Sequence, residues 1–381
     1  MTAIRKCTIL TLAILFVLHA SGFAQKSRAQ KEIKKLMKQY SAVGLSVAVV
    51  KENKIVYSHS FGLKNIEQHT RLENRDIFRI ASISKSFSAT SIMQLCEAGK
   101  LSLDDDFSKL VGFTVRNPKY PDAVITLRMV LSHTSSINDS QGYFELDVIN
   151  PDKNPGYAGC YSDYPPGGGY KYCNLNFNMI GAVIERISGE RFDRYVFNHI
   201  LKPLNLYGGY CVDSLDQSLF VTLYEYDTAS KKFTPAPEAY NPRREQIKNY
   251  VPGYSTPVFS PTGGMKISAT DLAKYMTMHM NMGEFNGIRI ISDASAQQMQ
   301  SIVSEQAQYG LALLTTDKFI PGKQLKGHTG SAYGLYSLML FSPDEKFGFV
   351  LITNGCNPVY SEGWNEFLKS SALVLYKRMI E

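Results

Sequence analysis

Ser82 and Lys85 are three residues apart in the segment Ser82-Ile83-Ser84-Lys85, where a helix is predicted to begin. On a helix, residues i and i+3 lie on one face with their Cβ atoms roughly 5 to 6 Å apart, so the lysine amine can reach the serine hydroxyl. This pair predicts a serine nucleophile that works without a histidine. A helix from Ser82 to Ala98, ended by Gly99, would also direct the Ser82 backbone N–H at the group under attack.

Lys85 alone is a poor base for this chemistry. An amine with its ordinary pKa near ~10.4 is protonated at neutral pH, and lowering that pKa by roughly 3 units through burial costs about 4 kcal/mol. Another polar group must therefore share the proton. A Ser-x-x-Lys spacing also arises about once by chance in a chain of this length, so the prediction depends on what else the sequence holds.

Two further motifs follow in order along the chain. Tyr172-Cys173-Asn174 is the only Tyr-x-Asn among 23 tyrosines, and Gly327-His328-Thr329-Gly330-Ser331 precedes a predicted pair of strands. Ser-x-x-Lys, Tyr-x-Asn and a His/Lys-Thr-Gly triplet in this order resemble the serine β-lactamase and penicillin-binding protein superfamily. The resemblance is to the branch that contains class C β-lactamases and related DD-peptidases and esterases.

The resemblance extends over most of the chain beyond its N-terminus. Leu131–Ser136 resembles a family segment whose final glycine is replaced here, and Tyr309–Leu311 resembles the strand before the third motif. The other matching stretches are Phe78–Ser82, Pro261–Met265 and Ser268–Ala273.

The resemblance implies a catalytic group of Ser82, Lys85 and Tyr172. Ser82 would be the acylated nucleophile, and Lys85 and Tyr172 would share its proton. The proton can be shared in two ways. Either Tyr172 is a phenolate stabilised by Lys85, or Lys85 is neutral and Tyr172 relays the proton. His133, which lies in the Leu131–Ser136 segment, is interpreted as a structural residue.

The resemblance also implies the substrate-binding residues, which are Asn174, His328, Thr329, Gly330 and Ser331. Asn174 would bind the amide carbonyl of the substrate and hold Lys85. The backbone N–H groups of Ser82 and Ser331 would form the oxyanion hole. His328 and Thr329 would line an edge strand to which a peptide-like substrate adds as a further strand.

His328 bears on the kind of hydrolase. Class C β-lactamases usually carry a lysine there, whereas the His-Thr-Gly form is similar to DD-carboxypeptidases and D-amino-acid peptidases of the branch. A histidine that titrates near pH ~6.5 attracts a substrate carboxylate less strongly than a permanent cation does. Arg243 or Arg244 would restore that charge.

The function predicted from these residues is a serine hydrolase with an acyl-serine intermediate, most like a DD-carboxypeptidase or D-amino-acid peptidase. A class C-type β-lactamase and a broad esterase are the enzymatic alternatives. The alternative from a different class is an inactive receptor for penicillin or cell-wall peptide. Predicted partners are small-molecule or peptide substrates, namely a D-amino-acid peptide, a β-lactam or an ester.

The first 24 residues are typical of a secretory signal peptide. Arg5 and Lys6 precede an apolar run from Thr8 to Leu18, and Gly22-Phe23-Ala24 forms a small-residue cleavage site. The run is too short to span a bilayer comfortably. We therefore predict a protein exported to the periplasm or the medium, without stable membrane insertion.

Composition argues against several other classes. The net charge of +7 is carried by scattered Lys and Arg residues, so no nucleic-acid partner is predicted. Neither His-Glu-x-x-His nor Gly-x-x-x-x-Gly-Lys-Ser/Thr occurs, so no metal or cofactor is predicted. Five cysteines follow the predicted signal, and Cys160 could pair with Cys173 or with Cys211. Oligomeric state is left open.

Strand patterns come from both ends of the chain and helices from its middle. Residues 31–40 have helical periodicity, and strands are predicted at Gly44–Val50, Ile55–Phe61, Leu335–Phe341 and Gly348–Thr353. Further helices are predicted at Leu127–Ser132, Phe177–Ser188 and Glu362–Arg378.

The predicted fold class is α/β (α+β), of β-lactamase/transpeptidase type. A mixed antiparallel sheet is flanked by N- and C-terminal helices, and a mostly helical domain is inserted. One catalytic domain, residues 25–381, would hold a sheet subdomain (about 30–80 plus 260–381) and a helical subdomain (about 82–258). The tyrosine-rich stretches 141–172 and 207–260 are expected to form the walls of the substrate pocket.

Overall fold

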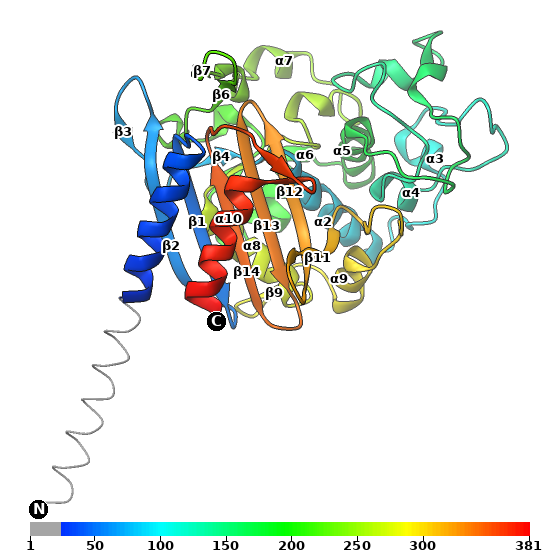
Figure 1. Cartoon of the computed structure of the whole chain (residues 1–381). Coiled ribbons are helices and arrows are strands. Elements are labelled where there is room, and N and C mark those ends of the chain that lie inside the picture. The colour runs from blue at the N-terminus through cyan, green and yellow to red at the C-terminus, as the bar shows by residue number, and fades with distance from the viewer. Residues whose placement is uncertain (1–23) are drawn as a thin grey trace, which may run out of the picture.

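A seven-stranded antiparallel sheet forms the centre of the computed structural model, which describes residues 24–381 (Figure 1). The strand order is β11-β12-β13-β14-β1-β2-β3, so strands from the two ends of the chain lie side by side. The strands of this sheet are β1 (Gly44–Lys51), β2 (Lys54–Asn65), β3 (Thr70–Arg71), β11 (Leu314–Ile320), β12 (Lys323–Ala332), β13 (Leu335–Ser342) and β14 (Phe347–Thr353). The predicted fold class is confirmed.

The four strands predicted from the sequence pair as two hairpins in this sheet. Glu52 and Asn53, which join β1 to β2, both have positive φ angles, at 49° and 66°. Asparagine tolerates this left-handed region better than most residues, which suits a tight hairpin turn. The segment between β13 and β14 likewise turns with Lys346 at φ 54°.

Helices cover both faces of the sheet. Figure 1 shows the helical residues 24–39, in blue, beside α10 (Glu366–Leu375), in red, and both pack on one face. α8 (Ala269–Met280) packs on the other face through the larger hydrophobic cluster. The remaining helices are α2 (Ser84–Glu97), α3 (Phe107–Val111), α4 (Leu127–Leu131), α5 (Asn174–Ser188), α6 (Phe192–Val196), α7 (Arg244–Lys248) and α9 (Asp293–Gln300).

Short strands complete the fold. β4 (Phe78–Arg79) and β5 (Gly208–Gly209) pair with the two sides of β8 (Lys266–Ile267), which anchors the backbone just before Ser82. The others are β6 (Tyr224–Asp227), β7 (Lys232–Pro235), β9 (Glu284–Phe285), β10 (Ile288–Arg289), β15 (Tyr360–Ser361) and β16 (Trp364–Asn365).

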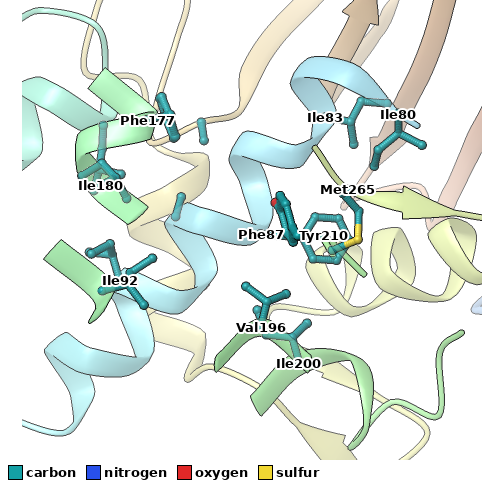
Figure 2. Close-up of a cluster of buried hydrophobic side chains, with 14 of the residues drawn as sticks. Ile80, Ile83, Phe87, Ile92, Phe177, Ile180, Val196, Ile200, Tyr210 and Met265 are labelled. Carbon is teal, nitrogen blue, oxygen red and sulfur yellow. The ribbon is translucent and has the colours of Figure 1, made fainter. Parts of the chain in front are cut away.

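α2 lies at the centre of the larger hydrophobic cluster. Figure 2 shows Phe87 and Ile92 of α2 among side chains that include Phe177 and Ile180 of α5, all buried. α2 is buried on every side, because eleven of its residues are buried and several of these are serines and threonines. Its hydroxyls donate to backbone carbonyls, either within the helix, as Ser91 Oγ does to Phe87 O at 2.9 Å, or outside it, as Ser88 Oγ does to Pro261 O at 3.1 Å. The helix that follows Ser82 is therefore held firmly in the core.

Some sequence-based expectations differ from the structure. Tyr309–Leu311 is not a strand, because Tyr309 makes only isolated bridges and β11 begins at Leu314. All five cysteines of the described chain are free, so the suggested pairing of Cys160 is wrong. The predicted signal peptide lies outside the described residues except for residue 24. The division into sheet and helical subdomains stays a proposal.

Among residues 24–381, no helix is both long enough and apolar enough to cross a membrane. Within the same residues, no group of three His, Cys, Asp or Glu side chains is placed so that it could hold a metal ion.

The buried imidazole of His279 should make the stability of the folded protein depend on pH. It is fully buried in α8, and burial lowers its pKa to about 3. Because an unfolded histidine titrates near 6.5, the unfolded state binds more protons between pH 3 and 6.5, and stability falls as pH falls through that window. We expect His279→Gln to reduce the stability lost between pH 8 and pH 5 by about 2 kcal/mol. Urea unfolding of both proteins at the two pH values measures this.

His69→Gln serves as the control, because His69 is exposed. It should leave the stability lost between pH 8 and pH 5 unchanged. If His279→Gln loses as much stability as the unsubstituted protein over this range, then His279 is not the buried neutral histidine of this argument.

Candidate active site

Ser82 lies in a 3-10 turn, Ala81–Ile83, that leads directly into α2. Ala81 has φ 49°, a left-handed conformation that costs a non-glycine residue about 1 kcal/mol or more. Three contacts hold the turn there. Ser84 Oγ donates to Ala81 O at 2.6 Å, Ser337 Oγ to Ile80 O at 2.9 Å, and Ile80 N to Met265 O at 2.9 Å. Ser82 is therefore presented on a strained but well-supported turn.

Lys85 points back at Ser82, as the three-residue spacing predicts. Lys85 Nζ lies 3.1 Å from Ser82 Oγ, 2.9 Å from Asn174 Oδ1 and 2.9 Å from Thr262 O. The side chain is fully buried, and burial lowers its pKa to about 7, although the nearby Asp139 acts to raise it. The lysine is therefore tuned close to neutral pH, where an amine can accept a proton.

Tyr172 lies beside this pair. Lys85 Nζ is 4.8 Å from the centroid of the Tyr172 ring. Burial raises the pKa of the phenol well above its usual value, and a hydrogen bond with the Ser82 side chain opposes that rise. The structure thus brings Ser82, Lys85 and Tyr172 together from two distant parts of the chain.

Asn174 is held by a residue that the sequence did not single out. Asp139 Oδ2 accepts from the Asn174 backbone N–H at 2.8 Å and from its Nδ2 at 2.9 Å, and Asp139 Oδ1 accepts from Leu175 N at 2.9 Å. Asn174 Oδ1 accepts from Lys85 Nζ and from Thr262 Oγ1, both at 2.9 Å. A capping carboxylate 35 residues before its helix has no local signature, because caps are recognised in sequence only from adjacent residues.

The third motif runs along β12. Gly330 packs against the turn that holds Ser82, because a Cβ there would lie 2.3 Å from Ile80 O and 2.4 Å from Ser337 Oγ. β11 pairs with β12 only as far as Gly327, so in the described chain residues 328–332 have β13 on one side and no strand on the other. An edge strand was expected here from the sequence. β12 as a whole is not one, because β11 lies outside it, but residues 328–332 have a free edge.

His328 is neutral, which corrects the expectation that it titrates near pH ~6.5. Its Nδ1 lies 2.5 Å from Thr329 O and its Nε2 lies 3.0 Å from the Tyr309 hydroxyl. A carbonyl oxygen only accepts, so Nδ1 carries the hydrogen and Nε2 accepts from Tyr309. Burial, together with the nearby Lys85, lowers the pKa of His328 to about 3. The third motif therefore carries no positive charge near neutral pH.

The motif residues line one cavity of about 760 Å³. Ser82, Tyr172, Asn174 and residues 328–331 all belong to its wall. Both tyrosine-rich stretches contribute to the wall, as the sequence predicts. Its aromatic side chains are Tyr143, Phe144, Tyr170, Tyr172, Tyr309, Tyr333, Tyr336, Tyr360 and Trp364.

Neither Arg243 nor Arg244, which were expected to restore the positive charge lost with His328, lies at this site. Arg244 Nε pairs with Asp213 at 3.1 Å, Arg243 Nη1 donates to Gln246, and neither arginine lines the cavity. The arginine in the wall is Arg79, which is only 8% exposed. Its Nε donates to Gly263 O at 2.9 Å and its guanidinium lies 4.9 Å from the centroid of the Tyr333 ring, so it supports the wall.

His133 braces the second motif from outside the cavity. Its Nδ1 accepts from Cys173 N at 3.1 Å, its carbonyl accepts from Lys171 N at 2.9 Å, and its ring centroid is 4.4 Å from that of Tyr172. Burial lowers its pKa well below the usual value. These contacts agree with the structural interpretation of His133.

Comparison with known proteins places these residues in context. A protein-family model described as Beta-lactamase matches residues 29–372. Protein flp of Staphylococcus aureus (strain N315) is 23% identical over 322 residues, which cover 82% of this chain and 59% of that protein. The chain thus spans about three fifths of the length of that relative. Penicillin-binding protein 4 of Amycolatopsis lactamdurans is 27% identical over 296 residues, covering 73% of this chain and 72% of that protein.

Solved structures show the same architecture. The octameric penicillin-binding protein homologue from Pyrococcus abyssi has a TM-score of 0.73 at 25% identity, covering 92% of this chain and 77% of that chain. The D-amino acid amidase from Ochrobactrum anthropi SV3, in complex with D-phenylalanine, has a TM-score of 0.69 at 18% identity and covers 92% of this chain and 99% of that one. At 18% identity the second likeness is one of fold alone.

Proposed function

Because this chain belongs to the Beta-lactamase family of serine hydrolases, we propose that it forms an acyl-serine intermediate on Ser82 and hydrolyses D-amino-acid peptides or a similar amide or ester. The activity is of the DD-carboxypeptidase or D-amino-acid peptidase kind. Export to the periplasm or the medium is part of the proposal and depends on residues 1–24. The observation that carries the catalytic proposal is the buried Lys85 amine 3.1 Å from Ser82 Oγ in the wall of the cavity.

The electrostatics of the site favour one of the two proton-sharing arrangements. Burial lowers the pKa of Lys85 to about 7 and raises that of Tyr172. Both shifts favour a neutral amine with a neutral phenol over an ammonium with a phenolate. Lys85 is therefore proposed as the base and Tyr172 as the relay.

The proposed reaction begins with the acylation of Ser82. Ser82 Oγ attacks the carbonyl carbon and its proton passes to Lys85 Nζ. The backbone N–H groups of Ser82 and Ser331 stabilise the oxyanion of the tetrahedral intermediate. The bond to the leaving amine breaks as that amine takes the proton through Tyr172. Water then attacks the ester on Ser82, which frees the acid and restores the hydroxyl.

The neutral His328 favours substrates that carry no carboxylate beside the reacting bond, such as amides and esters, over β-lactams. A lysine in this place would attract the carboxylate of a lactam, whereas His328 offers no charge and no free N–H, because both ring nitrogens are already bonded. The aromatic wall of the cavity suits an apolar acyl side chain. The D-amino acid amidase neighbour has the same fold, which agrees with this substrate class.

A panel of four substrates tests the proposal. These are a D-Ala-D-Ala peptide, the same peptide with its C-terminal carboxylate amidated, a chromogenic cephalosporin and a short-chain ester. We expect the peptide and its amide to be hydrolysed, with kcat/KM for the amide at least equal to that for the acid, and only slow lactam turnover. Steady-state kinetics from pH 5 to pH 8 gives the ratio of amide to acid.

The pH dependence of that ratio distinguishes the models of His328. With His328 neutral, any change of the ratio across this range should follow the single midpoint of Lys85 near pH 7, because no second charge is gained near the substrate carboxylate. A second fall of the ratio toward pH 5, beyond the midpoint of Lys85, would show that His328 takes up a proton. Fast lactam turnover without peptide cleavage would replace the proposed function by that of a β-lactamase.

A further inference from the structure

We propose that Asp139 is a positioning residue, which holds the side-chain amide of Asn174 so that Oδ1 faces Lys85 Nζ. This inference rests on the proposed function, because it concerns how the base is kept ready for acyl transfer. Asp139 belongs to none of the three sequence motifs and precedes Tyr172 by more than thirty residues.

The orientation of an Asn amide is decided by its partners, since its oxygen and nitrogen are nearly equal in shape. A carboxylate only accepts, so the Asp139 oxygen at 2.9 Å must face Nδ2 of Asn174. Oδ1 of the amide is then directed at Lys85 Nζ and Thr262 Oγ1. Without Asp139 the amide is free to turn over and present Nδ2 to the lysine.

Asp139 also begins the helix that carries Asn174. α5 has no capping side chain of its own at Cys173, and the first two N–H groups of the helix donate to the two carboxylate oxygens of Asp139. The Cys173 thiol lies 3.2 Å from the same carboxylate. One side chain therefore fixes the start of α5, the Asn174 amide and, through that amide, the lysine.

The charge of Asp139 acts on Lys85 as well. Asp139 raises the pKa of Lys85 and so opposes the effect of burial. The other titratable groups that face Lys85 are neutral near pH 7, because burial raises the pKa values of Tyr172 and Cys173 and lowers those of His133 and His328. Removing the charge of Asp139 should therefore lower the pKa of Lys85, a change that a purely structural role would not produce.

The test compares Asp139→Asn with the unsubstituted protein by two readouts. The first is the pH dependence of Ser82 acylation by a fluorophosphonate. The second is the titration of the Lys85 side chain, followed by the NMR signal of its ¹³Cε, which needs no turnover. We expect acylation on the order of 100-fold slower at the plateau and both titration midpoints lower by roughly half a unit or more.

Two further variants control for stability. Asp106→Asn removes another capping carboxylate, which accepts from Ser108 N at 3.0 Å at the start of α3 and lies outside the cavity wall. It should lower stability and leave both midpoints unchanged. Asp139→Glu keeps the charge on a longer side chain, so acylation should slow while the Lys85 midpoint moves less than in Asp139→Asn.

The outcomes separate this inference from the proposed function. If Asp139→Asn folds and acylates at the original rate with unchanged midpoints, or slows only as Asp106→Asn does, the positioning role is wrong. If Asp139→Asn does not fold, Asp139→Glu decides, because an unchanged acylation rate in it would also refute the role. If Ser82 of the unsubstituted protein takes no label but the Lys85 midpoint still falls in Asp139→Asn, the positioning role holds and the proposed function fails.

Discussion

Ser82→Ala is expected to abolish covalent labelling by a fluorophosphonate or a fluorescent penicillin, and to lower kcat for every substrate by roughly 10³-fold or more. The reason is that Ser82 Oγ is the atom proposed to receive the acyl group, and no other hydroxyl forms a hydrogen bond with Lys85 Nζ among the described residues. Labelling is read from a fluorescent gel and from the mass of the intact protein.

Ser91→Ala is the matched control, because Ser91 lies in the same helix and its hydroxyl donates only to Phe87 O, outside the cavity wall. It should label at the original rate. Label that persists in Ser82→Ala would remove Ser82 from the mechanism. An unsubstituted protein that takes label on Ser82 but turns over no substrate would be the penicillin- or peptide-binding receptor of the alternative hypothesis.

Lys85→Arg is expected to slow Ser82 acylation by a factor of about 10³ relative to the plateau at high pH and to remove its pH dependence, while the rate of the unsubstituted protein rises as pH rises through about 7. The acylation rate rises with pH because only the neutral amine of Lys85 accepts the Ser82 proton. With a pKa of about 7, roughly one tenth of the amine is neutral at pH 6 and about nine tenths at pH 8. A guanidinium stays protonated throughout, so it cannot replace the amine.

The measurement is the second-order rate of fluorophosphonate acylation from pH 5 to pH 9. Lys266→Met is the control, because Lys266 is also a buried lysine, with its Nζ 2.7 Å from Tyr210 O, but it is outside the cavity wall. Its pH midpoint should match that of the unsubstituted protein. A rate that shows no midpoint near pH 7 and is still rising at pH 9 would assign the base to an unshifted lysine or to the Tyr172 phenol.

Patterns that depend on neighbouring residues could be predicted from the sequence. The β-rich stretches Gly44–Val50 and Ile55–Phe61 predicted the strands of the first hairpin, and the three-residue spacing predicted that Lys85 reaches Ser82. The family resemblance, which is confirmed, predicted the fold. The motif residues then fall in one cavity wall, where their individual roles remain predictions.

Features that depend on distant partners could not be predicted. α5 was expected from Phe177 but begins at Asn174, because the carboxylate that caps it comes from Asp139, far back in the chain. His328 was expected to titrate near pH ~6.5, and it is neutral because burial and the nearby Lys85 lower its pKa. In both cases the deciding contact joins residues that no periodicity or local motif connects.

The order of strands in the central sheet has a consequence for the synthesis of the protein. β1 pairs with β14, with Leu45 opposite Thr353, so folding must close a loop of roughly 300 residues. β12, which carries Gly330, reaches β1 only through β13 and β14. A ribosome must therefore deliver nearly the whole chain before Gly330 can pack against the turn that presents Ser82. A nascent or prematurely terminated chain would hold the nucleophile but no assembled cleft, so acyl transfer would begin only when translation is almost complete, after a slow, topologically demanding folding step.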